Sequence, residues 1–83
     1  MQPRQLQEYD VVRLIAIRDA RFEGAKIFYE RLPQVGDVGT ILEVYSVPEL
    51  GYEIECSDPS TGITIWLDAI YPAEIELFKD MKK

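Results

Sequence analysis

A glycine turn that leads directly into a β-branched stretch, residues 35–45, limits the fold of this chain more than any other feature. Gly36 and Gly39 can adopt backbone conformations with φ > 0, which residues with a Cβ disfavour, and Asp37 can hydrogen-bond its own backbone to close the bend. The residues that follow are apolar and stiff at χ1, as a half-buried strand requires. This pattern predicts the diverging turn and second strand of a small barrel.

Apolar segments separated by turn residues complete a five-stranded pattern. The expected strands cover residues 9–17, 40–45, 52–56, 63–68 and 73–78. A long first loop, residues 18–35, separates the first two strands, and residues 69–72 predict a short 3₁₀ turn before the last one. Short strands without a strong helical pattern favour an all-β fold, namely a small five-stranded SH3-like barrel.

Period-two alternation along the expected strands predicts which side chains face the core. The inward-facing residues expected on this basis are Val12 and Leu14, Tyr52, Ile54 and Cys56, Ile63, Ile65 and Leu67, and Ile75 and Leu77. If the isoleucines of the fourth strand face inward, Trp66 between them faces outward. The indole is then available for binding.

The length of the chain suits one domain with one small core. We expect residues 1–83 to form a single domain whose ends, residues 1–8 and 79–83, are frayed. A hydrophobic content of 47% is too high for intrinsic disorder. Nine Lys and Arg against fifteen Asp and Glu give a net charge of −6, which repels phosphate backbones and anionic lipid. Nucleic acid and membranes are therefore poor fits as partners.

Several kinds of catalytic and metal chemistry are missing from the chain, which has no histidine and a single cysteine, Cys56. Zinc sites built from Cys and His, and Ser-His or Cys-His nucleophile pairs, are thereby excluded within it. Glu53 and Glu55 share one strand face, but outward glutamates on a small barrel are better explained as solvated than as paired catalytic carboxylates. We expect no enzyme activity, no metal and no cofactor. The lone cysteine and the lack of a signal-peptide pattern favour a reducing cytoplasm.

Aromatic and acidic side chains form the strongest candidate binding surface. The candidate binding residues are Tyr29, Trp66, Tyr71, Pro72, Glu53 and Asp68. Peptide-binding SH3 domains place rings from a first loop, a tryptophan and a Tyr/Pro 3₁₀ turn around one shallow groove that holds extended chains. The carboxylates are available to meet basic residues of a partner. A core or edge-packing role for the rings is the competing interpretation.

Four short motifs occur in a fixed order along the chain. They are Tyr9-Asp10-Val11-Val12-Arg13-Leu14, Val35-Gly36-Asp37-Val38-Gly39-Thr40-Ile41, Tyr52-Glu53-Ile54-Glu55 and Ala73-Glu74-Ile75-Glu76. Over residues 9–78 this order resembles a family of small bacterial proteins known as domain of unknown function 4926. The resemblance implies an SH3-like barrel and brings no catalytic residues. More loosely, residues 36–44 are similar to KOW motifs of ribosomal and transcription proteins.

Three functions are consistent with these features. The leading hypothesis is a non-enzymatic interaction module that binds a protein or peptide through the aromatic, acidic surface. A nucleic-acid-associated function is the alternative suggested by the KOW-like turn and by four arginines, Arg13, Arg18, Arg21 and Arg31. The third hypothesis is an accessory subunit that docks on a larger enzyme, or on a second copy as a weak homo-oligomer, through a strand edge.

Overall fold

The computed structural model describes residues 5–18, 30–47 and 49–79. Its elements are β1 (Val11–Leu14), β2 (Val38–Tyr45), β3 (Gly51–Ser57), β4 (Thr64–Ile70), the 3₁₀ helix η1 (Pro72–Glu74) and β5 (Ile75–Lys79). Within these residues, no helix has the length and apolar content needed to cross a bilayer. Of the ends predicted to be frayed, residues 1–4 and 80–83 lie outside the described residues, and Lys79 belongs to β5.

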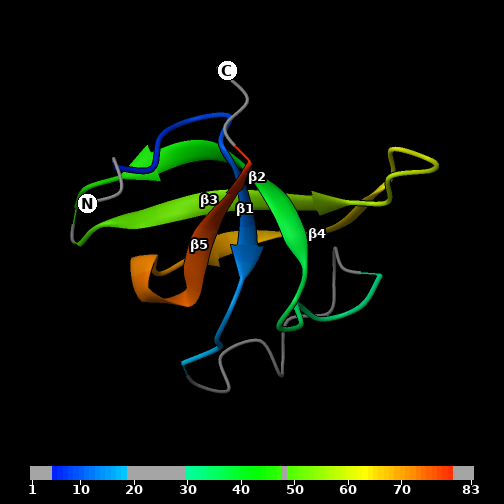
Figure 1. The fold of residues 1–83 in the computed structure, drawn as a ribbon, viewed down its shortest axis with the longest axis horizontal. Helices are drawn as coiled ribbons and strands as arrows, with labels where there is room; N and C mark the ends of the chain where they lie inside the picture. Colours follow the sequence, from blue (N-terminus) through cyan, green and yellow to red (C-terminus); the bar gives the residue numbers. More distant parts are fainter. Residues whose placement is uncertain (1–4, 19–29, 48, 80–83) are drawn as a thin grey trace.

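All five strands belong to one antiparallel sheet in the order β4-β3-β2-β1-β5 (Figure 1). This confirms the predicted all-β class with five strands. β1 lies between β2 and β5, so the first and last strands are neighbours in the sheet, and β4 and β5 are its edge strands. Register irregularities interrupt the β1-β5, β2-β3 and β3-β4 pairings. Such bulges bend the strands and increase their twist.

The two glycines of the turn before β2 serve different purposes. Gly36 has φ +101°, and the turn closes where the Asp37 N–H donates to the Gln34 carbonyl at 3.0 Å. Gly39 lies inside β2 and is not in the left-handed region, so the expectation of positive φ holds for Gly36 alone. A Cβ at Gly39 would lie 2.7 Å from the Glu55 carbonyl oxygen. Gly39 is therefore required for the close approach of β3 to β2.

The core lies on one face of this sheet and draws on all five strands. Its buried hydrophobic residues are Val12, Leu14, Ile41, Tyr52, Ile54, Cys56, Trp66, Ile70 and Ile75. The predicted inward faces of β1, at Val12 and Leu14, and of β3, at Tyr52, Ile54 and Cys56, are confirmed. In β3 the residues between the buried ones are glutamates, which makes the alternation unambiguous, and in β1 the exposed Arg13 separates the two buried residues.

The predicted faces of the fourth strand are wrong for Ile63, Trp66 and Leu67, whereas Ile65 packs partly buried against the core. Trp66 is 1% exposed, whereas Ile63 is 59% and Leu67 is 42% exposed, so the outward placement of Trp66 is wrong. In the β3-β4 register Trp66 lies opposite Cys56, which faces the core, and paired residues share a face. An indole also removes more apolar surface from water than an isoleucine does. β4 has apolar residues on both faces, so burial of the larger side chain decides its orientation.

The end of the chain differs from its prediction in two details. The 3₁₀ helix precedes the last strand as expected, but it covers Pro72–Glu74, because Ala69 and Ile70 continue β4 and Ile70 pairs with Tyr52. In β5, Ile75 is buried as predicted. Leu77 is 36% exposed instead of facing fully inward, since β5 is an edge strand with β1 as its one neighbour in the sheet.

Candidate functional site

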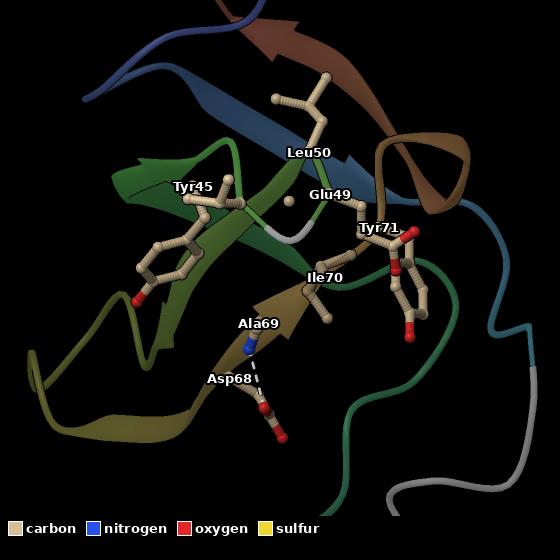
Figure 2. Close-up of a pocket in the computed structure, with 9 residues that line it drawn as sticks. Tyr45, Glu49, Leu50, Asp68, Ala69, Ile70 and Tyr71 are labelled. Atoms are coloured by element: carbon tan, nitrogen blue, oxygen red, sulfur yellow. Dashed lines mark hydrogen bonds between the residues drawn. The ribbon is translucent and has the colours of Figure 1, made fainter.

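A pocket of about 290 Å³ lies between the β2-β3 connection and the end of β4 (Figure 2). Its lining residues are Tyr45, Val47, Glu49, Leu50, Gly51, Asp68, Ala69, Ile70 and Tyr71, and we call it the hairpin groove. In Figure 2, Tyr45 and Tyr71 lie on opposite sides, with Ala69 and Ile70 between them. The volume is at the small end of the range for ligand sites, which suits one or two side chains of a partner.

Tyr45 forms one side of the hairpin groove and is fixed by a carboxylate. It is the last residue of β2, where it lies opposite Gly51 at the start of β3. Its hydroxyl donates a hydrogen bond of 2.8 Å to Glu53 Oε1. This bond, with the negative charge of Glu53, raises the pKa of Tyr45 above its usual value, so the phenol stays protonated. The ring is therefore held as a neutral aromatic surface.

Tyr71 forms the other side and is positioned by the buried carboxylate of Glu74. The Tyr71 N–H donates to Glu74 Oε1 at 2.9 Å, and the Arg18 N–H donates to Glu74 Oε2 at 2.7 Å. The Glu74 carbonyl also accepts the Ile15 N–H at 2.7 Å. Glu74 thus ties the chain after β1 to the turn that carries Tyr71. The guanidinium carbon of Arg18 lies 4.3 Å from the centroid of the Tyr71 ring.

The remaining polar residues of the hairpin groove are acidic. Glu49 is exposed in the β2-β3 connection, and Asp68 is half-buried in β4, where its carboxylate accepts the Ala69 N–H at 2.7 Å. None of the nine described lining residues is basic. Negative side chains beside an aromatic, apolar surface favour a partner that carries positive charge.

The structure places only some of the sequence-predicted binding residues at the hairpin groove. Tyr71 and Asp68 line the hairpin groove, Glu53 holds Tyr45 from outside it, and Pro72 is half-buried at the start of η1. Tyr29 lies outside the described residues. Sequence reasoning assigned no binding role to the connection between the expected second and third strands, which supplies Val47, Glu49 and Leu50 to the groove. The available signal was its apolar Val47 and Leu50, which are 81% and 37% exposed.

Trp66 is not part of the hairpin groove. Its indole Nε1 donates to Asp37 Oδ2 at 2.8 Å, inside a network that joins β4 to the turn before β2. Arg31 donates through two guanidinium nitrogens to the same carboxylate, at 2.9 and 2.8 Å, and the Gln34 N–H donates at 2.9 Å. Asp37 therefore accepts four hydrogen bonds and acts as a structural link, in addition to its predicted place in the turn.

The Asp37 carboxyl has a pKa below its usual value. Partial burial by itself raises this pKa, but the hydrogen bonds from Arg31, Gln34 and Trp66, with the charge of Arg31, outweigh that effect. The same pairing raises the pKa of Arg31. A carboxyl with a depressed pKa in the folded state stabilises the fold above its unfolded pKa and loses that contribution as pH falls through the folded value.

Asp37→Asn should therefore lower the free energy of unfolding by about 1–3 kcal/mol at pH 7, because hydrogen bonds to a charged acceptor are lost. The difference from the unsubstituted chain should begin to shrink below about pH 4, where the Asp37 carboxyl of the unfolded chain takes up a proton, and should be lost only as pH falls through the lower pKa of the folded carboxyl. Urea unfolding at pH 7 and pH 3 measures both differences. Asp58→Asn is the control, because this turn carboxyl accepts from the uncharged Ser60 N–H and hydroxyl, and it should cost under about 1 kcal/mol. An Asp37→Asn penalty that is equal at both pH values would contradict the network.

Other candidate chemistry in the described residues is accounted for by packing and hydrogen bonding. Cys56 is buried, and burial raises the pKa of its thiol, which keeps it in the unreactive protonated form. Glu53 accepts from Tyr45, and Glu55 accepts from Thr64, so the two carboxylates have separate partners. No group of three or more metal-ligating side chains comes together in the part of the chain that the structure describes.

Two arginines of the nucleic-acid alternative are engaged within the fold. Arg13 forms an ion pair with Glu76, with Nε 2.9 Å from Oε2, and Arg31 is paired with Asp37. Each pair neutralises a positive charge that phosphate contacts would need. These pairings do not favour a basic surface.

A second hollow of about 430 Å³ lies beside the turn before β1. Gln7, Glu8, Tyr9 and Val44 line it. Tyr9 is 63% exposed and has φ +72°, an uncommon conformation for a residue with a bulky side chain. This hollow has one aromatic ring, whereas the hairpin groove combines two rings with apolar residues from two segments. We therefore take the hairpin groove as the candidate site.

Comparison of the chain with protein families, with curated proteins and with solved structures finds no match.

Proposed function

We propose that this protein is a non-enzymatic interaction module that binds a protein or peptide through the hairpin groove. The observation that carries the proposal is the pairing of Tyr45 and Tyr71 across an apolar floor, with Glu49 and Asp68 beside them. Tyrosine is enriched at binding hot spots because a rigid ring offers much contact area at little cost in conformational entropy. An open groove of this size suits a short extended segment better than a small substrate.

We also propose that the five strands form an SH3-like barrel and that the chain is related to the domain of unknown function 4926 family. The sheet has β4 and β5 at its edges, so a barrel requires these two strands to curl toward each other. The register irregularities supply the bending that closure requires. The buried free thiol of Cys56 is consistent with the cytoplasmic location proposed from the sequence.

Docking by a strand edge is the second candidate function. β4 and β5 are edge strands, and an edge presents backbone groups that can pair with another chain. One backbone group of β4 is already hydrogen-bonded within the chain, because the Ile65 carbonyl accepts the Glu30 N–H at 2.8 Å. Light scattering of the purified protein distinguishes a monomer from a homo-oligomer formed in this way.

Selection from a phage-displayed peptide library tests the groove proposal, followed by affinity measurements on variants. Tyr45→Ala and Tyr71→Ala should each weaken a selected peptide at least about tenfold, as expected for hot-spot tyrosines. Tyr9→Ala removes an exposed tyrosine at the second hollow and should leave the affinity within about twofold. Circular dichroism confirms that each variant is folded. Loss of binding in Tyr9→Ala alone would place the site at the second hollow instead.

A further inference from the structure

One tyrosine of the hairpin groove already contacts a cation from its own chain. The guanidinium of Arg18 lies over the Tyr71 ring, 4.3 Å from its centroid. Arginine is the cation that stacks best on an aromatic face, because its guanidinium is planar and weakly hydrated. This cation–π contact shows that a tyrosine of the groove can hold a guanidinium against its ring face.

The other tyrosine has the same chemistry and a second feature that strengthens it. The Tyr45 hydroxyl donates to Glu53 at 2.8 Å, which fixes the ring and places a negative charge beside it. Both effects favour a cation over the ring face. In the described part of the chain, the cation–π contacts involve Phe78 and Tyr71, and Tyr45 has no such cation.

Carboxylates within the groove supply the complementary charge. Glu49 is exposed on the β2-β3 connection, and Asp68 comes from β4 on the other side of the groove. A guanidinium can pair with a carboxylate through two parallel hydrogen bonds, which a lysine ammonium cannot do. The net charge of −6 further favours the approach of a cationic segment.

We propose that the hairpin groove selects an arginine side chain of its peptide partner. The guanidinium stacks on Tyr45 and pairs with a carboxylate of the groove, while the aliphatic stem lies against the exposed Leu50 and Ala69. This inference rests on the proposed docking function and adds the chemistry of the partner. The guanidinium of Arg18 already stacks on the Tyr71 ring, so we assign the arginine of the partner to the Tyr45 side.

Two labelled peptides test this assignment by fluorescence anisotropy. The first is Gly-Ala-Leu-Arg-Leu-Ala-Gly, and the second has citrulline, the neutral isostere of arginine, in place of the arginine. The arginine peptide should bind at least about fivefold more tightly at low ionic strength, and its advantage should fall as salt is added. Glu49→Gln should reduce that advantage at least about twofold. Asp58→Asn removes one charge at the opposite end of β4 and should leave the advantage of the arginine peptide unchanged.

The outcomes separate the inference from the function on which it rests. Equal binding of the two peptides overturns arginine selection but leaves a peptide-docking groove. Equal effects of Glu49→Gln and Asp58→Asn overturn it as well, because the preference would then come from net charge and not from the groove. Binding of neither peptide, at protein concentrations into the millimolar range, counts against both the arginine assignment and this groove as a docking site.

Discussion

Replacing Glu74 by Ala should lower the free energy of unfolding by about 3 kcal/mol, since a fully buried acceptor of two backbone hydrogen bonds is removed. The N–H groups of Arg18 and Tyr71 would then lack that buried carboxylate as their acceptor. A single core of this size supplies about 3–5 kcal/mol in total, so we expect a large unfolded fraction at 25 °C. Urea unfolding followed by circular dichroism measures the change.

Glu76→Ala is the matched control for this substitution. Glu76 lies two residues further along, in β5, and its ion pair with Arg13 is close to half exposed on each side. An exposed pair of this kind contributes less than about 1 kcal/mol. Glu74→Gln keeps one acceptor oxygen and should fall between the two alanine variants. Equal losses for Glu74→Ala and Glu76→Ala would show that the buried carboxylate is not what holds the turn.

Gly39→Ala is the second substitution with a large expected effect, a loss of about 2–4 kcal/mol. The added Cβ would lie 2.7 Å from the Glu55 carbonyl oxygen and 2.7 Å from Ile54 Cγ2. The carbonyl belongs to the paired strand β3 and cannot rotate away, so β2 and β3 would have to separate. The midpoint of thermal unfolding should fall by at least about 8 °C for a domain of this size.

Gly51→Ala provides the comparison for Gly39→Ala, because both glycines lie in strands and neither has positive φ. The nearest atom to a Cβ at Gly51 is the Ile70 carbonyl oxygen at 3.7 Å, an ordinary van der Waals contact. This variant should stay within about 0.5 kcal/mol of the native chain. A similar loss in both variants would mean that close packing at Gly39 is not the cause.

The sequence predicts a strand face well where only one face is apolar. β3 alternates buried Tyr52, Ile54 and Cys56 with glutamates, and the structure has the same faces. β4 carries apolar residues on both faces, so its alternation does not specify which face is buried. Which face of β4 is buried depends on the irregular register beside Cys56 and on the distant Asp37, which accepts a hydrogen bond from the Trp66 indole. Neither feature follows from local spacing.

The candidate site was predictable only in part for the same reason. Tyr71 and Asp68 lie near the expected 3₁₀ turn, and both line the hairpin groove. Tyr45 and the β2-β3 connection enter the site because β3 pairs with β4, a contact that chain order alone does not establish. Glu74 was assigned to a strand, although its spacing of three residues from Tyr71 is that of a capping box.

The most direct test of the central claim, that the hairpin groove is the docking surface, is a ¹H-¹⁵N NMR titration of the protein with a library-selected peptide. The largest shift changes are expected at Tyr45, Leu50, Ala69 and Tyr71, with small changes on β1 and β5. Largest changes at Arg13 and Phe78, which contact each other on those two strands, would contradict the central claim.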